Sequence, residues 1–280
     1  MLKKRVITAL WGIPLLIAAV WFDQPLPWFS VLVAVWGMLA VYEFYRLVDV
    51  RKVRSLAIFG LLWTLLFIIS RDSDLLSILE SRFNPSLFTP FLLTSAVVLP
   101  LIWLLLRSGK DRTFISWAWT VAGILYVGWL LGYLVAIRGV DDGRNWVFYT
   151  MFVVFASDTA AFFIGRAFGR RKLAPQISPG KTWEGAIGGI FGSAIISLFF
   201  ILPTPLILPF SWWQALILGI IISIFGQAGD LAESLLKRNA GVKDSSDRIS
   251  VPGHGGFLDR IDSVVFAGVV VYYYVVWVVQ

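Results

Sequence analysis

The sequence has no cysteine and only one histidine among its 280 residues. The absence of cysteine excludes disulfide bonds, thiolate metal sites and cysteine nucleophiles. Charged residues are also scarce, at 15% of the chain, whereas a soluble domain contains about 25%. Hydrophobic residues make up 58% instead. This composition predicts a polytopic membrane protein.

Long apolar runs are the dominant pattern of the chain. A helix needs about 20 mainly apolar residues to cross about 30 Å of hydrocarbon. The predicted fold class is therefore an all-α polytopic membrane protein with about nine transmembrane helices. The nine predicted segments are residues 6–22, 27–45, 56–70, 90–106, 115–137, 146–164, 183–202, 212–236 and 257–279. Between the third and fourth segments, residues 74–80 are predicted to form a short amphipathic surface helix.

The lysines and arginines predict the orientation of these segments. With the N-terminus in the cytoplasm and the C-terminus outside, 20 of the 24 basic residues fall in cytoplasmic connections, as membrane proteins require. The net charge of +7 is thereby explained by orientation, and no nucleic-acid partner is expected. We expect five scaffold spans in residues 1–145 and a four-span catalytic region with cytosolic polar loops in residues 146–280.

Carboxylates occur near the cytoplasmic ends of the last two segments. Asp230 lies in the eighth segment, and Asp259 and Asp262 begin the ninth, which runs in the opposite direction. An ionisable residue at mid-membrane costs about 2.5–3.5 kcal/mol on insertion scales, so such residues are usually functional. Convergent oxygen ligands favour Mg²⁺. These three acids are predicted metal ligands; alternatively, they only pair with bases such as Lys237 and Arg260.

Basic residues accompany the acids. Asp230, Ser234 and Lys237 follow an i, i+4, i+7 spacing and share one helix face, and Asp158 of the sixth segment lies at a similar depth. Asp230, Asp259, Asp262 and Lys237 are the predicted catalytic residues. Acids for a metal beside bases for phosphates indicate a nucleotide or phospho-substrate site.

A second candidate site precedes the seventh segment. Ser178, Lys181 and Thr182 lead into a helix whose N-terminus could bind an anion. The stretch is not a Walker A motif, and positive-inside charge followed by helix capping explains it about as well. Four glycines that follow are predicted to let neighbouring helices pack closely. They are Gly185, Gly188, Gly189 and Gly192.

Two single residues complete the inventory. His254 lies among glycines in a tight turn before the ninth segment and is predicted to contact substrate. Glu43 is expected to pair with Arg46 at an i, i+3 spacing and is not assigned to the site.

Four motifs resemble one known family. They read SDTAA at 157–161, SPGKTWEG at 178–185, SLLKR at 234–238 and PGHGGFLDRID at 252–262. Together they resemble the signature of the phosphatidate cytidylyltransferases, also called CDP-diacylglycerol synthases. The resemblance implies a multi-pass homodimer in the inner (plasma) membrane, with its active site facing the cytoplasm. It also implies that CTP and phosphatidic acid react in the lipid bilayer, with one or two Mg²⁺ ions, to give CDP-diacylglycerol and pyrophosphate.

The resemblance, with the reasoning above, gives a set of substrate-binding residues. They are Asp158, Ser178, Lys181, Thr182, Glu184, Ser234, Arg238, Lys243, Asp244, His254, Gly255, Gly256 and Arg260. One departure from the family pattern is a longer spacing, of seven residues, between Asp244 and Pro252. Two other functions stay open. One is another CTP-dependent lipid enzyme, either a polyprenol kinase or a cytidylyltransferase for a non-diacyl lipid phosphate; the other, disfavoured by the lack of an internal repeat, is a transporter.

Overall fold

The computed structural model describes the chain except for residues 1, 23–26, 50–55, 81–84, 107–112 and 242–255. The chain divides into two compact units. The first unit comprises Met1–Gly139 and Ala240–Asp259, and the second comprises Val140–Asn239 and Arg260–Gln280. Each unit is therefore built from two separate pieces of the chain. The predicted division at residue 145 concerns roles and stays a prediction.

Each of the nine predicted apolar segments coincides with a helix, and the fold is that of an all-α polytopic membrane protein. Among the described residues, six helices are long and apolar enough to cross a membrane, whereas three apolar helices are shorter: Leu10–Trp21, Ala57–Ile69 and Trp183–Phe199. In order, the helices of the first unit are α1 (Leu2–Trp21), α2 (Trp28–Asp49), α3 (Ala57–Ile69), α4 (Ser73–Glu80), α5 (Pro85–Leu106), α6 (Thr113–Gly123), the π-helical turn η1 (Ile124–Trp129) and α7 (Leu130–Arg138).

The second unit contains the remaining elements. They are α8 (Gly143–Phe168), β1 (Lys172–Ala174), β2 (Ser178–Thr182), α9 (Trp183–Phe199), α10 (Trp212–Ala240), α11 (Asp262–Tyr274) and the π-helical turn η3 (Val275–Val279). The short 3-10 turn η2 (Leu258–Arg260) crosses from the first unit into the second.

In the first unit, the side chain of Tyr45 fixes the packing of three helices. The Tyr45 hydroxyl of α2 donates a hydrogen bond to the carbonyl oxygen of Thr120 in α6 at 2.8 Å. Its ring lies against Gly60 of α3 and Gly123 of α6, where an added Cβ would come within 2.0 Å and 2.6 Å of ring atoms. Only glycine leaves room for a buried aromatic ring at both positions.

The predicted short helix after the third segment is confirmed as α4. Its N-terminus is capped by Asp72, whose Oδ1 accepts hydrogen bonds from the backbone amides of Asp74 at 3.1 Å and Leu75 at 3.0 Å. The hydroxyl of Ser30 in α2 donates to the other carboxylate oxygen of Asp72. An acidic side chain at a helix start accepts hydrogen bonds from N–H groups that have no partner within the helix. Because Asp72 also accepts a hydrogen bond from Ser30, it links α4 to α2.

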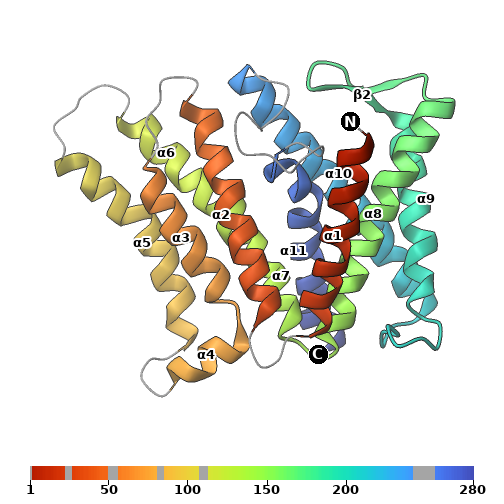
Figure 1. The fold of residues 1–280 in the computed structure, drawn as a ribbon, viewed down its shortest axis with the longest axis horizontal. Helices are drawn as coiled ribbons and strands as arrows, with labels where there is room; N and C mark the ends of the chain where they lie inside the picture. The colour runs from red at the N-terminus through yellow and green to blue at the C-terminus, as the bar shows by residue number, and fades with distance from the viewer. Residues whose placement is uncertain (1, 23–26, 50–55, 81–84, 107–112, 242–255) are drawn as a thin grey trace. The chain divides into compact units, whose positions relative to one another are not determined.

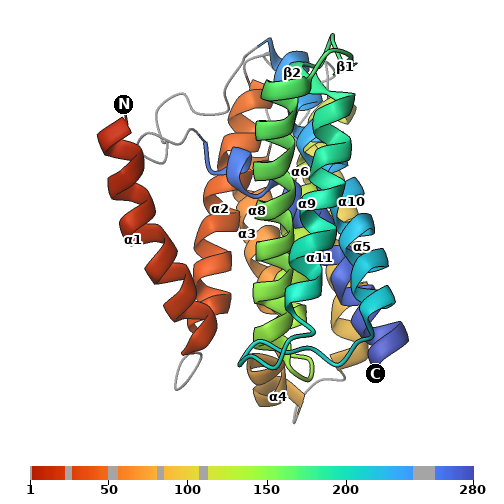
Figure 2. The same ribbon diagram turned by 90° about the vertical axis from the view of Figure 1, so that its right-hand side faces the viewer.

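In the second unit, α8 and α9 lie side by side along the predicted glycine stripe (Figures 1 and 2). A Cβ added to Gly192 would lie 2.5 Å from the Cβ of Ala160, and one added to Gly189 would lie 3.0 Å from the carbonyl oxygen of Ser157. A Cβ at Gly185 would lie 2.7 Å from the carbonyl oxygen of Ala161. The predicted packing role of these glycines is confirmed.

A two-stranded antiparallel hairpin joins α8 to α9. This connection was predicted only as a loop before the seventh segment; in the structure Lys172 pairs with Thr182, and Ala174 pairs with Ser178. The prolines at 175 and 179 disfavour a helix here, because proline has a fixed φ and no N–H and cannot continue a helix. Because strand β2 ends where α9 begins, the hairpin places its side chains at the ends of two rigid helices.

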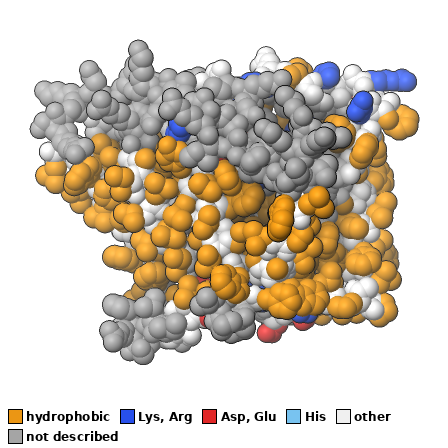
Figure 3. Space-filling view, viewed as in Figure 1, with side chains coloured by type: hydrophobic (Ala, Val, Ile, Leu, Met, Phe, Trp, Pro, Cys, Tyr) orange, Lys and Arg blue, Asp and Glu red, His pale blue; other side chains and the backbone are white. Residues whose placement is uncertain are grey.

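The described surface is mostly hydrophobic on the face drawn in Figure 3. Large apolar side chains are exposed on helices of both units, among them Trp11 in α1, Leu105 in α5, Phe163 in α8 and Phe191 in α9. A soluble protein rarely exposes so much contiguous apolar surface. Lipid chains are the solvent that this surface fits.

The glycine stripe makes a direct test of α8–α9 packing. We expect Gly192→Val to lower the free energy of unfolding by about 1–3 kcal/mol, because the added carbons overlap Ala160. Thermal unfolding in detergent measures the loss. Gly12→Val in α1 is the matched control, since nothing lies within 4 Å of a Cβ at that position. Equal melting temperatures of the two variants would contradict the assigned packing.

Candidate active site

Two glycines of α10 bring the start of α11 against it. A Cβ added to Gly229 would lie 2.3 Å from the carbonyl oxygen of Asp262. One added to Gly226 would lie 3.6 Å from the carbonyl oxygen of Ser263. Because Gly229 immediately precedes Asp230, this close approach places Asp230 and Asp262 at the same level of two neighbouring helices. The helix packing thus produces the convergence of carboxylates that the sequence predicted for these two residues.

Three acids from three helices interact at this place. Asp262 is repelled by Asp230 and by Asp158 of α8, and Asp230 also repels Asp158. Asp230 and Asp262 are half-buried, whereas Asp158 is exposed. Like charges held together in an apolar bundle raise the free energy of the site unless cations compensate them. The predicted substrate residue Asp158 therefore belongs to the same acidic cluster as two predicted metal ligands.

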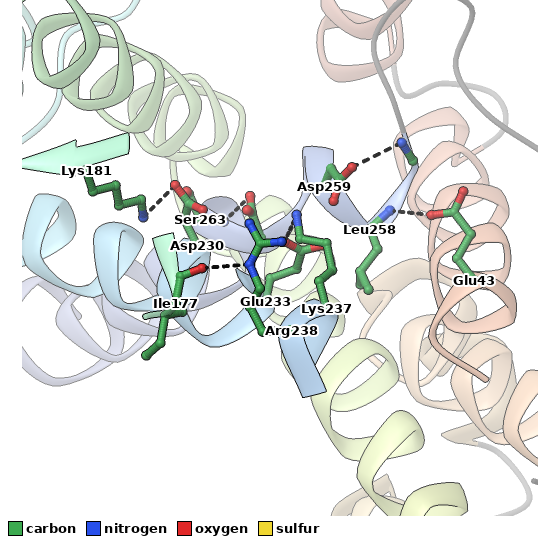
Figure 4. A network of polar contacts seen from close by, with 12 residues as sticks. Glu43, Ile177, Lys181, Asp230, Glu233, Lys237, Arg238, Leu258, Asp259 and Ser263 are labelled. Atoms are coloured by element: carbon green, nitrogen blue, oxygen red, sulfur yellow. Dashed lines mark hydrogen bonds and ion pairs between the residues drawn. The ribbon is translucent and has the colours of Figure 1, made fainter. Parts of the chain in front are cut away.

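Cations from three elements compensate this cluster. Lys181 of β2 forms an ion pair with Asp230, with Nζ 2.7 Å from Oδ2 (Figure 4). Lys181 and Arg260 attract Asp158, and Lys237 of α10 attracts Asp262. The predicted basic residues Lys181, Lys237 and Arg260 thus surround the acids from both chain pieces of the second unit.

The hairpin is held in place by residues predicted to bind substrate. The buried hydroxyl of Thr182 accepts the amide N–H of Gly185 at 3.1 Å and caps α9. The carboxylate of Glu184 accepts the amide N–H groups of Arg170 and Arg171 at 3.1–3.2 Å. Both side chains therefore make structural contacts that fix the hairpin carrying Lys181, and their contact with substrate stays a prediction.

Other predicted residues occupy different surroundings. Arg238 donates from Nε to the carbonyl oxygen of Ile177 at 3.0 Å, which joins the end of α10 to the hairpin turn (Figure 4). Ser178 is half-buried at the start of β2, and Ser234 is buried in α10. Their predicted roles at the substrate are not tested by these contacts.

The glycine-rich part of the site is only partly described. In the first unit, the buried Gly256 donates its N–H to the carboxylate of Asp259 at 3.3 Å. Asp259 makes this contact at the start of η2, and its predicted metal role stays a prediction. Four predicted substrate residues lie outside the described residues: Lys243, Asp244, His254 and Gly255.

The chain is similar to known proteins over most of its length. Residues 3–278 match the cytidylyltransferase family. The chain belongs to that family. It is 35% identical to the phosphatidate cytidylyltransferase of Bacillus subtilis (strain 168) over 240 residues. This aligned region is 85% of this chain and 85% of that protein.

Two staphylococcal phosphatidate cytidylyltransferases are also similar to this cytidylyltransferase-family chain. The protein of Staphylococcus saprophyticus is 37% identical over 232 residues, 82% of this chain and 84% of that protein. The protein of Staphylococcus haemolyticus is 45% identical over 158 residues, 56% of this chain and 58% of that protein. Family membership agrees with the resemblance that the four motifs indicated.

A divalent metal would suit the donor chemistry of this acidic cluster. In the part of the chain that the structure describes, no three aspartate, glutamate or histidine side chains lie close enough together to hold an ion as they stand. However, Asp158, Asp230 and Asp262 repel one another, and carboxylate oxygens are the ligands that Mg²⁺ prefers. A divalent cation would relieve this repulsion more fully than the single ammonium of Lys181.

Sequence reasoning missed two buried glutamates. Glu233 in α10 is fully buried and forms an ion pair with Lys237 four residues later. The favourable order of glutamate before lysine at i, i+4 was the available signal. Glu43 in α2 accepts the backbone N–H of Leu258 at 2.9 Å. No local spacing could reveal that contact, because the two residues are 215 positions apart.

The buried Glu233–Lys237 pair can be tested by a double-mutant cycle. We expect Lys237→Met to lower the free energy of unfolding by about 3–5 kcal/mol, because it removes the lysine partner of a buried carboxylate. The double variant Glu233→Gln, Lys237→Met should recover most of that loss in thermal unfolding in detergent. Lys172→Met, at an exposed position, is the control. A double variant as unstable as Lys237→Met alone would refute the pairing.

Proposed function

We propose that this chain transfers a cytidylyl group from CTP to phosphatidic acid, giving CDP-diacylglycerol and pyrophosphate. Three acids and their compensating cations on an apolar helix bundle are the observation that carries this proposal. The named activity of the Bacillus subtilis relative, which is similar over 85% of each chain, supports it. One substrate is a lipid and the other a soluble nucleotide, which suits a charged site in a membrane protein.

The cations provide the phosphate-binding chemistry. Lys181, Lys237 and Arg260 carry flexible or forked donors that bind phosphate oxygens. Nζ of Lys181 lies 2.7 Å from Oδ2 of Asp230. We propose that Lys181 exchanges this carboxylate for a phosphate oxygen when CTP binds. The ion pair then serves to hold the lysine in place before the substrate arrives.

The reaction needs positioning more than acid–base chemistry. A phosphate oxygen of phosphatidic acid attacks the α-phosphorus of CTP, and the bond from the α-phosphorus to the bridging oxygen of pyrophosphate breaks. The attacking oxygen is already ionised at neutral pH, so no general base is required. Lys181, Lys237 and Arg260 orient the two phosphates in line and offset their repulsion.

We propose Mg²⁺ as the cofactor, as one or two ions, held by Asp230 and Asp262, with Asp259 as a further predicted ligand. Asp158 lies within electrostatic reach of the first two acids and belongs to the same group of donors. When bound, Mg²⁺ would neutralise the triphosphate and stabilise the departing pyrophosphate. The repulsion among the acids supports a divalent cation at this place.

We propose that the protein lies in the inner (plasma) membrane, crosses it nine times and faces the cytoplasm with its active site. The positive-inside distribution, with 20 of 24 basic residues on one side, supports this orientation. Lys181, Lys237 and Arg260 belong to that cytoplasmic group, where CTP is available. A homodimer is proposed from the family resemblance alone.

Labelled CTP separates this function from its rivals. We expect label at the α-phosphate to appear in the lipid product when phosphatidic acid and Mg²⁺ are supplied. Label at the γ-phosphate appearing in a lipid would instead indicate a kinase. Substrate flux into liposomes without consumption of CTP would indicate a transporter.

The acidic cluster gives a mutational test of the same function. We expect Asp262→Asn to lower turnover by about 100-fold or more, because it removes a carboxylate from the proposed metal site. The Mg²⁺ dependence of lipid cytidylylation measures this loss. Asp74→Asn, at an exposed position in α4, should leave turnover unchanged. Normal activity of Asp262→Asn across a magnesium titration would refute the metal assignment.

Two lysines of the hairpin test the phosphate-binding role. Lys181→Met should lower kcat/KM for CTP by about 10–100-fold, since a hydrogen bond to a charged group contributes about 1.5–3 kcal/mol. Lys172→Met is the matched control, because Lys172 lies exposed in the paired strand. Similar kinetics of the two variants would show that Lys181 has no special role.

A further inference from the structure

One face of α2 holds the segment that leads into the last helix. Trp36 and Glu43 are seven residues apart, which places them on the same face of α2. The indole Nε1 of Trp36 donates to the carbonyl oxygen of Phe257 at 3.1 Å, and its ring meets the Phe257 ring edge-on at 5.2 Å. Glu43 Oε2 accepts the N–H of Leu258 at 2.9 Å (Figure 4). All of these residues belong to the first unit.

Glu43 is a costly residue in its position. It is only 3% exposed and lies in a helix apolar enough to cross a membrane. A buried carboxylate destabilises an apolar bundle unless its hydrogen bonds repay the desolvation. The long-range hydrogen bond to Leu258 therefore gives Glu43 a role that a neutral apolar residue could not fill.

The hydrogen bond from Leu258 acts at the first residue of a turn. Leu258 begins η2, and the N–H groups at a helix start have no partner within the helix. Glu43 supplies that partner from another helix, and the Leu258 side chain is fully buried beside it. The start of η2 is thereby fixed by α2. Asp259 is the next residue, and its carboxylate closes the turn by accepting the N–H of Gly256.

We propose that Glu43 is a positioning residue for the reaction: its carboxylate fixes the backbone turn that carries Asp259. This inference rests on the proposed function, because it assumes that Asp259 acts on CTP or its metal. Glu43 then acts through the backbone of the turn and not through a contact of its own with substrate.

Three variants of α2 test the proposal in the full-length protein in detergent. Glu43→Leu removes the acceptor, Glu43→Gln keeps a carbonyl oxygen for the Leu258 N–H, and Val35→Ala changes an exposed residue of the same helix. We expect Glu43→Leu to lower kcat for lipid cytidylylation by about 10–100-fold, with KM for CTP changed by less than about threefold. Glu43→Gln should recover most of the turnover, and Val35→Ala should match the unaltered protein.

Hydrogen–deuterium exchange supplies a readout that does not depend on activity. In Glu43→Leu, peptides covering residues 256–262 should exchange about tenfold faster, while peptides of α8 and α9 stay unchanged. Unchanged exchange in residues 256–262 would overturn the proposal. Equal loss of turnover in Glu43→Gln and Glu43→Leu would also overturn it, because charge and not hydrogen bonding would then be required.

Two further outcomes remain informative. If Glu43→Leu does not fold, Trp36→Phe takes its place, because it removes the donor to Phe257 and keeps an aromatic ring. Unchanged exchange of residues 256–262 in that variant would overturn the proposal, and faster exchange would support it. If the unaltered protein forms no cytidylyl product, the proposed function fails, whereas faster exchange in Glu43→Leu would still support the fixed turn.

Discussion

The compensation of carboxylates inside an apolar helix bundle is the constraint on which the second unit depends. Asp158, Asp230 and Asp262 repel one another, and the half-buried Asp230 and Asp262 would destabilise the bundle if their charges were left uncompensated. Lys181, which forms an ion pair with Asp230, comes not from a helix but from strand β2. The hairpin must therefore be held rigidly, which explains why Thr182, Glu184 and Arg238 bind backbone groups around it. The close packing of α8 and α9 serves the same end, because both helices carry the hairpin.

Much of the fold could be predicted because the bilayer imposes a simple length rule. Every predicted apolar segment is helical, and α4 was predicted from its amphipathic pattern. The glycines of α9 were also interpreted correctly, since small residues spaced along one face have few uses other than close packing. The hairpin was missed because strands of three and five residues leave little periodicity to detect. The contacts of Phe257 and Leu258 with α2 were missed because the residues that meet are more than 200 positions apart in the chain.

The residue types of the candidate site could be predicted from the sequence, but which of them contact backbone groups and which are available to substrate could not. Asp230 and Asp262 could be placed together because antiparallel helices put their ends at one level, and Asp158 joined them for the same reason. By contrast, sequence motifs do not distinguish a residue that touches substrate from one that fixes the backbone nearby. Thr182 and Glu184 lie within a family motif, yet the contacts seen are a helix cap and a carboxylate that binds two amides. The contact of Glu43 with Leu258 was not predicted, because spacing rules apply within one helix and Leu258 lies outside α2.

The interleaved order of the two units affects how the protein can be made. The first unit includes Phe257 and Leu258, which contact α2 but leave the ribosome only after most of the second unit has been synthesised. Until then, the Glu43 carboxylate has no Leu258 amide to accept, although α2 has already been produced. A nascent chain halted before residue 240 would therefore lack the Leu258 amide that donates to Glu43 in the finished protein.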